Sequence, residues 1–217
     1  AMVERAHAAG AWAHSDWVQA VGHIPVSFSD SGLDLASVSA HKFGGPVGIG
    51  VLLVRRGREP LELGLGGGQE RRIRSGTLPV ALAAGMAAAL QAALSNLTET
   101  AAGLKRLSDR LAAGISQIPR ARVNAARRAP HIVNATFTGA RADDVVLLLD
   151  QAGIDASMGS ACTAGVIRPS RVLLAMGHSE ADALSSVRFS LGWNSTDDDI
   201  DATLRALPGA VQAARQS

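Results

Sequence analysis

Cysteine is almost absent from this sequence: Cys162 is the only one among 217 residues. A single cysteine excludes any disulfide within the chain, and a chain of this length can bury a hydrophobic core without one. Disulfides are rare in reducing compartments, so a chain with a single cysteine is expected to be cytoplasmic. The thiol of Cys162 is then either a buried structural group or a reactive one.

Long apolar runs and basic tracts are missing as well. The longest apolar run, 80–90, reaches about half the length that a helix needs to cross a bilayer. The N-terminus lacks the apolar core of a signal peptide. Aromatic residues make up only 3% of the chain, and the formal net charge is +2, with the arginines spread along the sequence. We therefore expect neither a membrane span nor a nucleic-acid partner.

Lysine is scarce too, because only Lys42 and Lys105 stand among the 21 lysine and arginine residues. Lys42 lies in a glycine-rich segment, 39–50, between two apolar runs that read as strands. Arginine supplies the positive charge elsewhere in the chain. We therefore infer that position 42 holds a lysine because its amine can lose a proton. Lysine forms Schiff bases, whereas arginine stays charged. The alternative is a surface lysine in a turn, which the neighbouring Ser39 and His41 do not favour.

The pattern of apolar residues and helix breakers predicts strands and helices in mixed order. Three strands are expected in the first part, at 11–15, 34–39 and 50–55. The strand at 50–55 is apolar enough to be buried on both faces. One long helix is expected from Pro79 to about Ile118, with a kink near Gly103 that would link two lobes.

The second part of the chain has a similar mixture. The same patterns predict strands at 132–137 and 186–190, and helices at 142–152, at 169–176 and after Thr196. Thr196 precedes three aspartates, which suits the N-cap and first turn of a helix. We expect residues 1–100 to form half of an α/β sheet layer and residues 101–217 to form a smaller α+β lobe.

Three polar residues follow the first two predicted strands. Asp16 comes directly after the first strand, Gln19 lies three residues later, and Lys42 follows the second strand. Strand ends of one sheet can converge on a crevice. Pyridoxal phosphate needs a lysine for its Schiff base and an acid for its ring nitrogen, and an amide can donate to its ring oxygen. The alternative for Asp16 is a cap on a short helix.

Five segments in collinear order resemble the class V aminotransferases, and among them the cysteine desulfurases of the NifS/IscS type. They are Asp16-x-x-Gln19 with Ser39–Gly50, then Gly66–Thr77, Gly159–Gly165, Val187–Gly192 and the acidic helix start Thr196-Asp197-Asp198. One glycine-rich loop would be a weak signal, but five segments in order are a strong one. The resemblance implies part of a PLP-dependent transferase of fold type I. Residues 1–100 would be the C-terminal part of a large domain with a mostly parallel sheet, and residues 101–217 a small domain with the cysteine loop.

The resemblance also implies how the cofactor, pyridoxal 5′-phosphate, is held. Lys42 would form the Schiff base and move the Cα proton of the substrate. Asp16 would pair with the pyridine nitrogen and Gln19 with the ring oxygen. Ser39 and His41 would hold the phosphate, although His41 could equally be an ordinary polar residue. No metal is expected.

Three further residues take their roles from the same resemblance. Thr77 would reach the phosphate of the neighbouring subunit's cofactor, which implies a homodimer. Arg188 would bind the substrate carboxylate, and its planar guanidinium suits that partner. The alternative for Arg188 is a strand arginine paired with a structural acid. Cys162 would accept sulfur, and the small residues around it, 158–165, favour a reactive thiol over a buried one.

The implied reaction takes sulfur from L-cysteine and leaves alanine and a persulfide on Cys162. The sulfur would pass to an acceptor or to an iron–sulfur scaffold protein. Two alternatives stay open: a selenocysteine lyase, and a catalytically inactive fragment of such an enzyme. A generic α/β binding domain is a third, but it leaves the Lys42 and Cys162 segments unexplained.

Members of this family are about twice as long as this chain. By resemblance, the N-terminal half carries a phosphate-binding glycine/threonine loop, the histidine that stacks on the pyridine ring and several central strands. We find no replacement for these features in the sequence. We therefore expect that another chain completes the fold or that the chain is a fragment, which alone would bind the cofactor weakly or not at all.

Overall fold

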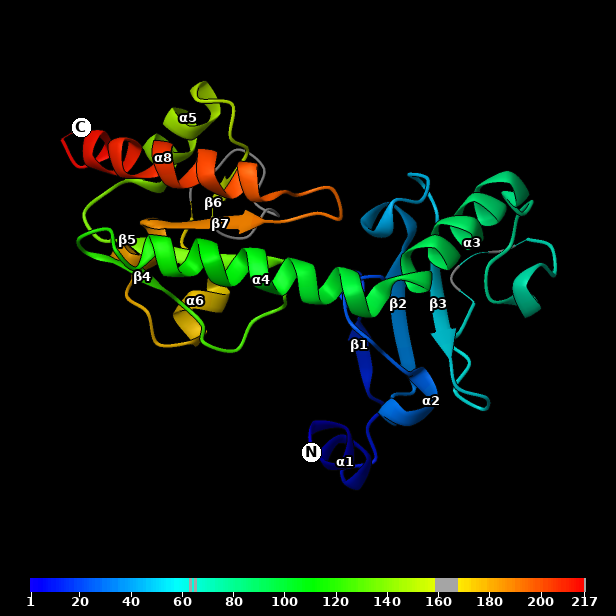
Figure 1. Cartoon of the computed structure of the whole chain (residues 1–217). Coiled ribbons are helices and arrows are strands. Elements are labelled where there is room, and N and C mark those ends of the chain that lie inside the picture. The colour runs from blue at the N-terminus through cyan, green and yellow to red at the C-terminus, as the bar shows by residue number, and fades with distance from the viewer. Residues whose placement is uncertain (63, 65, 159–167, 217) are drawn as a thin grey trace. The chain divides into compact units, whose positions relative to one another are not determined.

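The computed structural model describes residues 1–62, 64, 66–158 and 168–216 (Figure 1). The chain divides into two compact units, 1–99 and 100–217. Each unit contains one sheet with helices packed on it, which confirms the expected α/β class. Within the described residues no single helix is long and apolar enough to cross a membrane. The helices Val80–Ser95 and Leu97–Ile115 reach that length and composition only as a pair, and this pair is bent by 70°.

The first unit is built on a three-stranded mixed sheet in the order β1-β2-β3. Its strands are β1 (His14–Asp16), β2 (Leu35–Ser39) and β3 (Gly50–Val54). β1 and β2 run parallel, with Asp16 opposite Ser37, whereas β2 and β3 run antiparallel, with Ser39 opposite Gly50. β2 and β3 lie within one residue of the predicted bounds, whereas β1 begins three residues later than predicted, at His14. The antiparallel β3 makes this sheet mixed.

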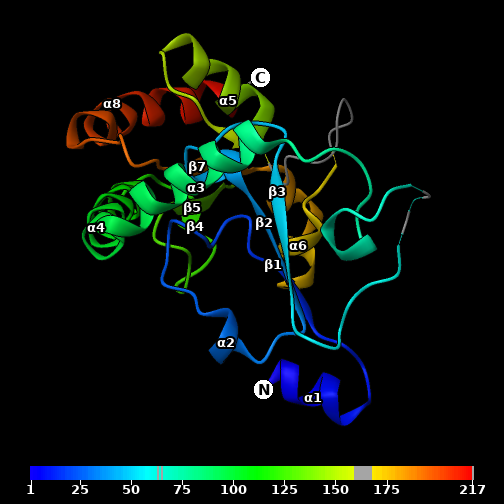
Figure 2. The same cartoon turned by 90° about the vertical axis from the view of Figure 1, so that its right-hand side faces the viewer.

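Helices α1 (Met2–Ala8), α2 (Phe28–Ser31) and α3 (Val80–Ser95) complete the first unit. Figures 1 and 2 show α3 beside β2 and β3. A small core forms between them, made of Val21, Val38, Ala40, Phe43 and Met86. Along β2 the side chains alternate, so that Ala36 and Val38 are buried while the neighbouring serines are only half-buried.

Two predictions about the first unit are wrong in detail. The strand at 50–55 is not buried on both faces, because Val51 and Leu52 are 42% and 43% exposed. In the described residues β3 is an edge strand with no strand beyond it. The long helix from 79 to 118 breaks at Asn96 rather than bending near Gly103. Asparagine competes for backbone hydrogen bonds and weakens a helix, while Gly103 lies inside a continuous helix, α4 (Leu97–Ile115).

The second unit is built on a four-stranded antiparallel sheet in the order β4-β5-β7-β6. The strands are β4 (Ala121–Val123), β5 (Ile132–Phe137), β6 (Ser157–Met158) and β7 (Ser186–Ser190). β5 and β7 lie at the residues that the sequence predicts. Their side chains alternate: Val133, Ala135 and Phe137 face one side, and Asn134 and Thr136 face the other.

Helices α4, α5 (Ala142–Gln151) and α8 (Asp197–Ala214) cover the apolar face and share its core. The shorter helices α6 (Arg171–Ala175) and α7 (Glu180–Leu184) stand outside that core, and Figures 1 and 2 show α6 on the opposite side of the sheet from α8. The predicted cap of the last helix is confirmed. Thr196 accepts the backbone N–H of Asp199, and the Asp199 carboxylate accepts the N–H of Thr196.

Candidate active site

The parallel pair β1 and β2 brings two predicted site segments to one edge of the first sheet. The backbone N–H of Trp17, just after β1, donates to the carbonyl oxygen of Ser37 at 2.8 Å. β2 ends two residues later, at Ser39, and a 3₁₀ turn over Ala40–Phe43 follows at once. Because parallel strands end at the same edge, Asp16 and the 3₁₀ turn both lie at the carboxyl end of this pair.

Lys42 is presented on that turn by its neighbours. Ala40 and Phe43 are buried and anchor the turn, while His41 and Lys42 point outward and are exposed. Gly44 ends the turn with a φ of 86°, a left-handed value that glycine adopts without strain. Within the part of the chain that the structure describes, the Lys42 amine makes no hydrogen bond and no ion pair, so it is available to a ligand.

Ser39 and His41 form a pair of their own. The Ser39 Oγ lies 2.8 Å from His41 Nδ1, so the hydroxyl and the imidazole share one hydrogen bond. Ser39 is half-buried and His41 is exposed. Together they offer hydroxyl and imidazole groups beside the Lys42 amine, a chemistry that suits a phosphate.

Asp16 is exposed at the end of β1. One carboxylate oxygen accepts the backbone N–H of Val18 at 2.8 Å, which closes a tight turn rather than capping a helix. The second oxygen has no partner among the described residues. Gln19 is exposed in the same turn. The turn therefore directs a carboxylate and an amide from the edge at which Lys42 stands.

Thr77 lies in the same unit, at the end of a loop that is closed by side chains. The Gly76 N–H donates to Gln69 Oε1 at 3.1 Å, and Arg74 donates to the carbonyl oxygens of Gly76 and Thr77 at 3.3 and 3.4 Å. Within this loop Glu70–Arg72 hold φ values of 47°, 57° and 67°, three left-handed residues in a row. Such backbone is costly without glycine, and it persists here next to a predicted site residue.

Arg188 belongs to the second unit, in the middle of β7. It stands opposite Asn134 on one side and opposite Ser157 on the other. Its Nε is buried and has no hydrogen-bond partner in the described ranges of the chain. In the described part of the chain no acid pairs with it, so the alternative of a structural ion pair is not observed. A buried donor that lacks an acceptor is costly, and it fits a group that binds an anionic ligand.

Cys162 and the loop 159–167 lie outside the described residues. Its predicted role, and the two alternatives of a buried and a reactive thiol, therefore stay predictions. Among the residues that are described, no group of three or more histidines, cysteines, aspartates and glutamates is arranged to hold a metal ion.

Sequence reasoning missed one buried acid, Asp34, which lies at the start of β2 and is 1% exposed. Its carboxylate accepts the Ala13 N–H at 2.8 Å, contacts His7 Nε2 at 2.8 Å and accepts Arg58 Nε–H at 3.0 Å. The Ala13 N–H, followed by His7, lowers the pKa of Asp34. The only signal in the sequence is a charged residue beside an apolar strand; its partners are distant along the chain.

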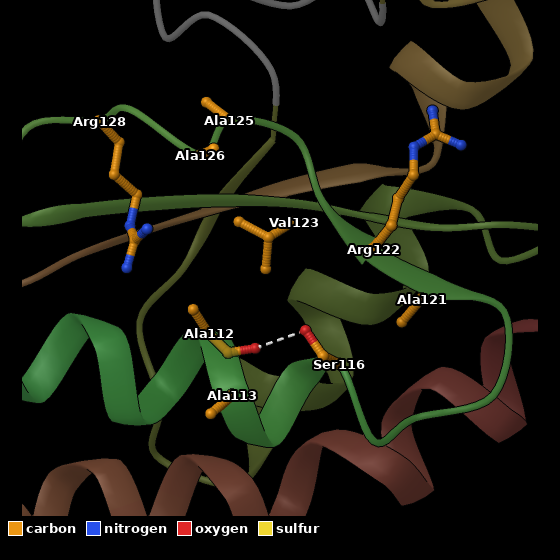
Figure 3. Close-up of a pocket in the computed structure, with 9 residues that line it drawn as sticks. All are labelled: Ala112, Ala113, Ser116, Ala121, Arg122, Val123, Ala125, Ala126 and Arg128. Atoms are coloured by element: carbon orange, nitrogen blue, oxygen red, sulfur yellow. Dashed lines mark hydrogen bonds between the residues drawn. The ribbon is translucent and has the colours of Figure 1, made fainter.

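The described cavities hold none of the predicted site residues. One hollow of about 430 Å³ lies between the end of α4 and the segment 121–128 (Figure 3). Its wall is mostly alanine, and its two arginines are engaged: Arg122 lies 3.1 Å from Asp182, and Arg128 lies 2.6 Å from Asp109. The described residues that the sequence assigns to the site therefore lie outside these hollows.

Comparison with known proteins gives the site a context. The family profile described as Aminotransferase class-V matches residues 1–203. The chain belongs to the class V aminotransferases. This family depends on pyridoxal phosphate, and the resemblance stated from the sequence segments is confirmed.

The chain is similar to named cysteine desulfurases. It is 50% identical over 208 residues to an IscS-like cysteine desulfurase of Mycobacterium tuberculosis (strain ATCC 25618 / H37Rv), covering 94% of this chain and 53% of the relative. It is 40% identical over 208 residues to the cysteine desulfurase IscS of Clostridium botulinum (strain Kyoto / Type A2), covering 94% and 52%. The crystal structure of a NifS-like protein from Rickettsia africae ESF-5 superposes with a TM-score of 0.88 at 30% identity, covering 97% and 56%. The chain thus spans about half the length of its relatives.

Proposed function

We propose that this chain is part of a PLP-dependent cysteine desulfurase. It would supply the cofactor-binding lysine, Lys42, and the cysteine that accepts sulfur, Cys162. One observation carries the proposal most: the parallel pairing of β1 and β2 puts Asp16 at the same sheet edge as Lys42, whose amine has no partner among the described residues. The names of the relatives support the reaction. In this proposal residues 1–100 are the C-terminal part of the large domain, and residues 101–217 are the small domain.

The residues at the sheet edge fit the cofactor. Lys42 would attach to its aldehyde carbon, and the free oxygen of Asp16 would accept the ring N–H. Gln19 would face the ring oxygen, while Ser39 and His41 would hold the phosphate. When bound, pyridoxal phosphate supplies an electron sink that stabilises negative charge at the substrate Cα.

The chain's own groups would perform the remaining steps on L-cysteine. Arg188 would hold the substrate carboxylate, and the Lys42 amine would remove the Cα proton. The Cys162 thiolate would attack the substrate sulfur, so that an S–S bond forms and the Cβ–S bond breaks with its electron pair left on carbon. Protonation at that carbon gives alanine, and the persulfide stays on Cys162.

The proposal extends to partners and location. Thr77 would contact the cofactor phosphate of a second copy, so the working form would be a homodimer. A sulfur-acceptor or iron–sulfur scaffold protein would take the persulfide sulfur. A reducing compartment such as the cytoplasm suits a chain whose one cysteine must stay reduced. A catalytically inactive chain is the second candidate, because this chain spans about half the length of its relatives.

The test uses the scarcity of lysine. The chain is mixed with pyridoxal phosphate, reduced with borohydride and measured as an intact mass and as peptides. We expect one adduct on the peptide that holds Lys42, its loss in Lys42→Ala and its retention in the control Lys105→Ala. An adduct that remains in Lys42→Ala contradicts the proposal, and no adduct in the parent favours the inactive candidate. Incubation of the loaded protein with L-cysteine should then add sulfur to the parent and not to Cys162→Ser.

A further inference from the structure

The polar face of the second sheet carries a cluster of hydrogen-bonded side chains next to Arg188. Asn134 and Thr136 stand on β5, Ser186 begins β7, and Asn124 directly follows β4. Thr136 and Ser186 are fully buried. The proposed function uses none of these four residues. Because buried polar groups are hydrogen-bonded, the distances in this cluster decide where its protons lie.

A backbone carbonyl fixes the first proton of the cluster. The Ser186 hydroxyl lies 2.7 Å from the carbonyl oxygen of Asp182, which can only accept, so Ser186 donates its single proton there. The Thr136 and Ser186 hydroxyl oxygens lie 2.8 Å apart, which is a hydrogen-bond distance. Only Thr136 still has a proton to place between them. Thr136 therefore donates to Ser186.

This direction fixes the amide of Asn124. The nitrogen and oxygen of an amide occupy equivalent positions, so the hydrogen-bond partners decide which is which. The end of the Asn124 amide that lies 2.8 Å from Thr136 Oγ1 meets an oxygen with no proton left to donate, so this end is the NH₂ group. The Asn124 oxygen then lies 3.3 Å from Ser186 Oγ, outside the hydroxyl bonding range. The reverse orientation would leave two hydroxyl oxygens 2.8 Å apart with no proton between them.

The same reasoning turns the amide of Asn134. Its end nearest Asn124 lies 2.6 Å from the Asn124 amide, at the end that is now the oxygen. Asn134 must therefore donate its NH₂ group there and turn its own oxygen away. β5 lies between β4 and β7 in the sheet, and Asn124 follows β4. The oxygen of Asn134 is thus directed to the β7 side.

Arg188 stands on that side, directly opposite Asn134 in the antiparallel register of β5 and β7. Side chains of such a pair stand next to each other on one face of the sheet. The buried Arg188 Nε has no partner among the described residues while Asn134 turns its NH₂ group to it, because two donors cannot bond. The orientation that the protons require presents an oxygen instead, which removes a costly unpaired donor.

We propose that Asn134 is a positioning residue, whose amide oxygen accepts the Nε–H of Arg188. This hydrogen bond fixes the plane of the guanidinium and leaves its two terminal NH₂ groups for the two oxygens of the substrate carboxylate. Asn124, Thr136 and Ser186 keep the amide turned in the required direction. The inference rests on the proposed role of Arg188 and states which residue orients it.

The first test follows the Arg188 Nε–H of the full chain, labelled with ¹⁵N, without any ligand. Asn134→Leu keeps about the same volume but removes the acceptor, so exchange of this proton with water should quicken at least about fivefold. Asn134→Asp keeps an acceptor oxygen and should restore the slow exchange, which a loss of packing alone does not explain. Asn96→Leu, at an exposed amide of the first unit, is the control and should change nothing.

Two results of this test overturn the inference. One is an exchange rate in Asn134→Leu equal to that of the parent. The other is a strong nuclear Overhauser cross-peak between the Asn134 NH₂ protons and the Arg188 Nε–H, because it would show that the NH₂ group, and not the oxygen, faces Arg188.

L-alanine separates this inference from the function on which it rests. We expect it to shift the Arg188 signal in the parent, whereas ethylamine, which is L-alanine without its carboxylate, should not. The affinity for L-alanine should fall at least about threefold in Asn134→Leu and stay unchanged in Asn96→Leu. If Asn134→Leu binds L-alanine as the parent does, the positioning role is overturned and that of Arg188 stands. If Arg188 does not respond in the parent, its carboxylate role fails, and the positioning role fails with it.

Discussion

The two units differ in how much core each contains. The first unit buries a cluster of five apolar residues, whereas the second buries a cluster of twenty. Helix α3 shows the same contrast: it is apolar nearly all round, yet Met86 is its only buried residue, while α4 buries one regular stripe. The second unit therefore holds itself together by packing, and the first relies more on polar contacts and leaves apolar surface exposed.

The largest expected effect is the loss of stability of the second unit when its largest fully buried side chain, Phe137, is removed. Phe137→Ala in β5 should destabilise the second unit by about 3–5 kcal/mol, because the cavity would stay lined by rigid neighbours. Urea unfolding measures the loss, and hydrogen exchange assigns it to a unit. Leu147→Ala, at a 55% exposed position of α5, is the control and should change little. Equal losses in both units would show that they unfold together.

Lowering the pH should reduce the stability of the first unit, because Asp34 becomes protonated. Its pKa is lowered in the folded chain, first by the Ala13 N–H and then by His7, so the stability it contributes is present above the ordinary carboxyl pKa. That contribution is lost as the pH falls through the lowered value. We expect Asp34→Asn to be less stable than the parent at neutral pH and to lose less stability on acidification.

Unfolding by urea between neutral and strongly acidic pH measures this difference. Asp150→Asn removes an exposed carboxylate of the second unit and should follow the parent curve. If Asp34→Asn and Asp150→Asn give the same pH profile, Asp34 does not anchor the first unit.

The smallest expected effect concerns the loop that ends at Thr77. Gln69→Ala removes the acceptor of the Gly76 N–H, so exchange of that amide with solvent should quicken by at most about tenfold. Gln69→Glu keeps an acceptor oxygen and should restore the slower exchange. No change in either variant would mean that the loop is held without this hydrogen bond.

Sequence reasoning succeeded where the signal is local. The strand at 186–190 alternates strictly between polar and apolar residues, the strand at 132–137 does so from Val133 onward, and the cap at Thr196 follows from the aspartates behind it. It failed where distant residues decide the outcome. The partners of Asp34 lie more than twenty residues away, and the exposure of β3 depends on which strands stand beside it.

The residues of the candidate site show the same difference between local signals and long-range contacts. The lysine, the acid at the end of β1 and the paired Ser39 and His41 could be proposed from residue type and position, and their roles stay predictions. The burial of Arg188 Nε could not be found in this way. An arginine in a predicted strand carries no such signal until the packing of the second sheet leaves its Nε buried, opposite Asn134 in the strand register.

The left-handed turn at Glu70–Arg72 has a consequence for chemical synthesis of the loop. The left-handed backbone region that strains an ordinary L-residue is the relaxed helical region for a D-residue, its mirror image. A peptide copy of this loop with D-amino acids at those three positions should therefore hold the turn more firmly than the natural chain does.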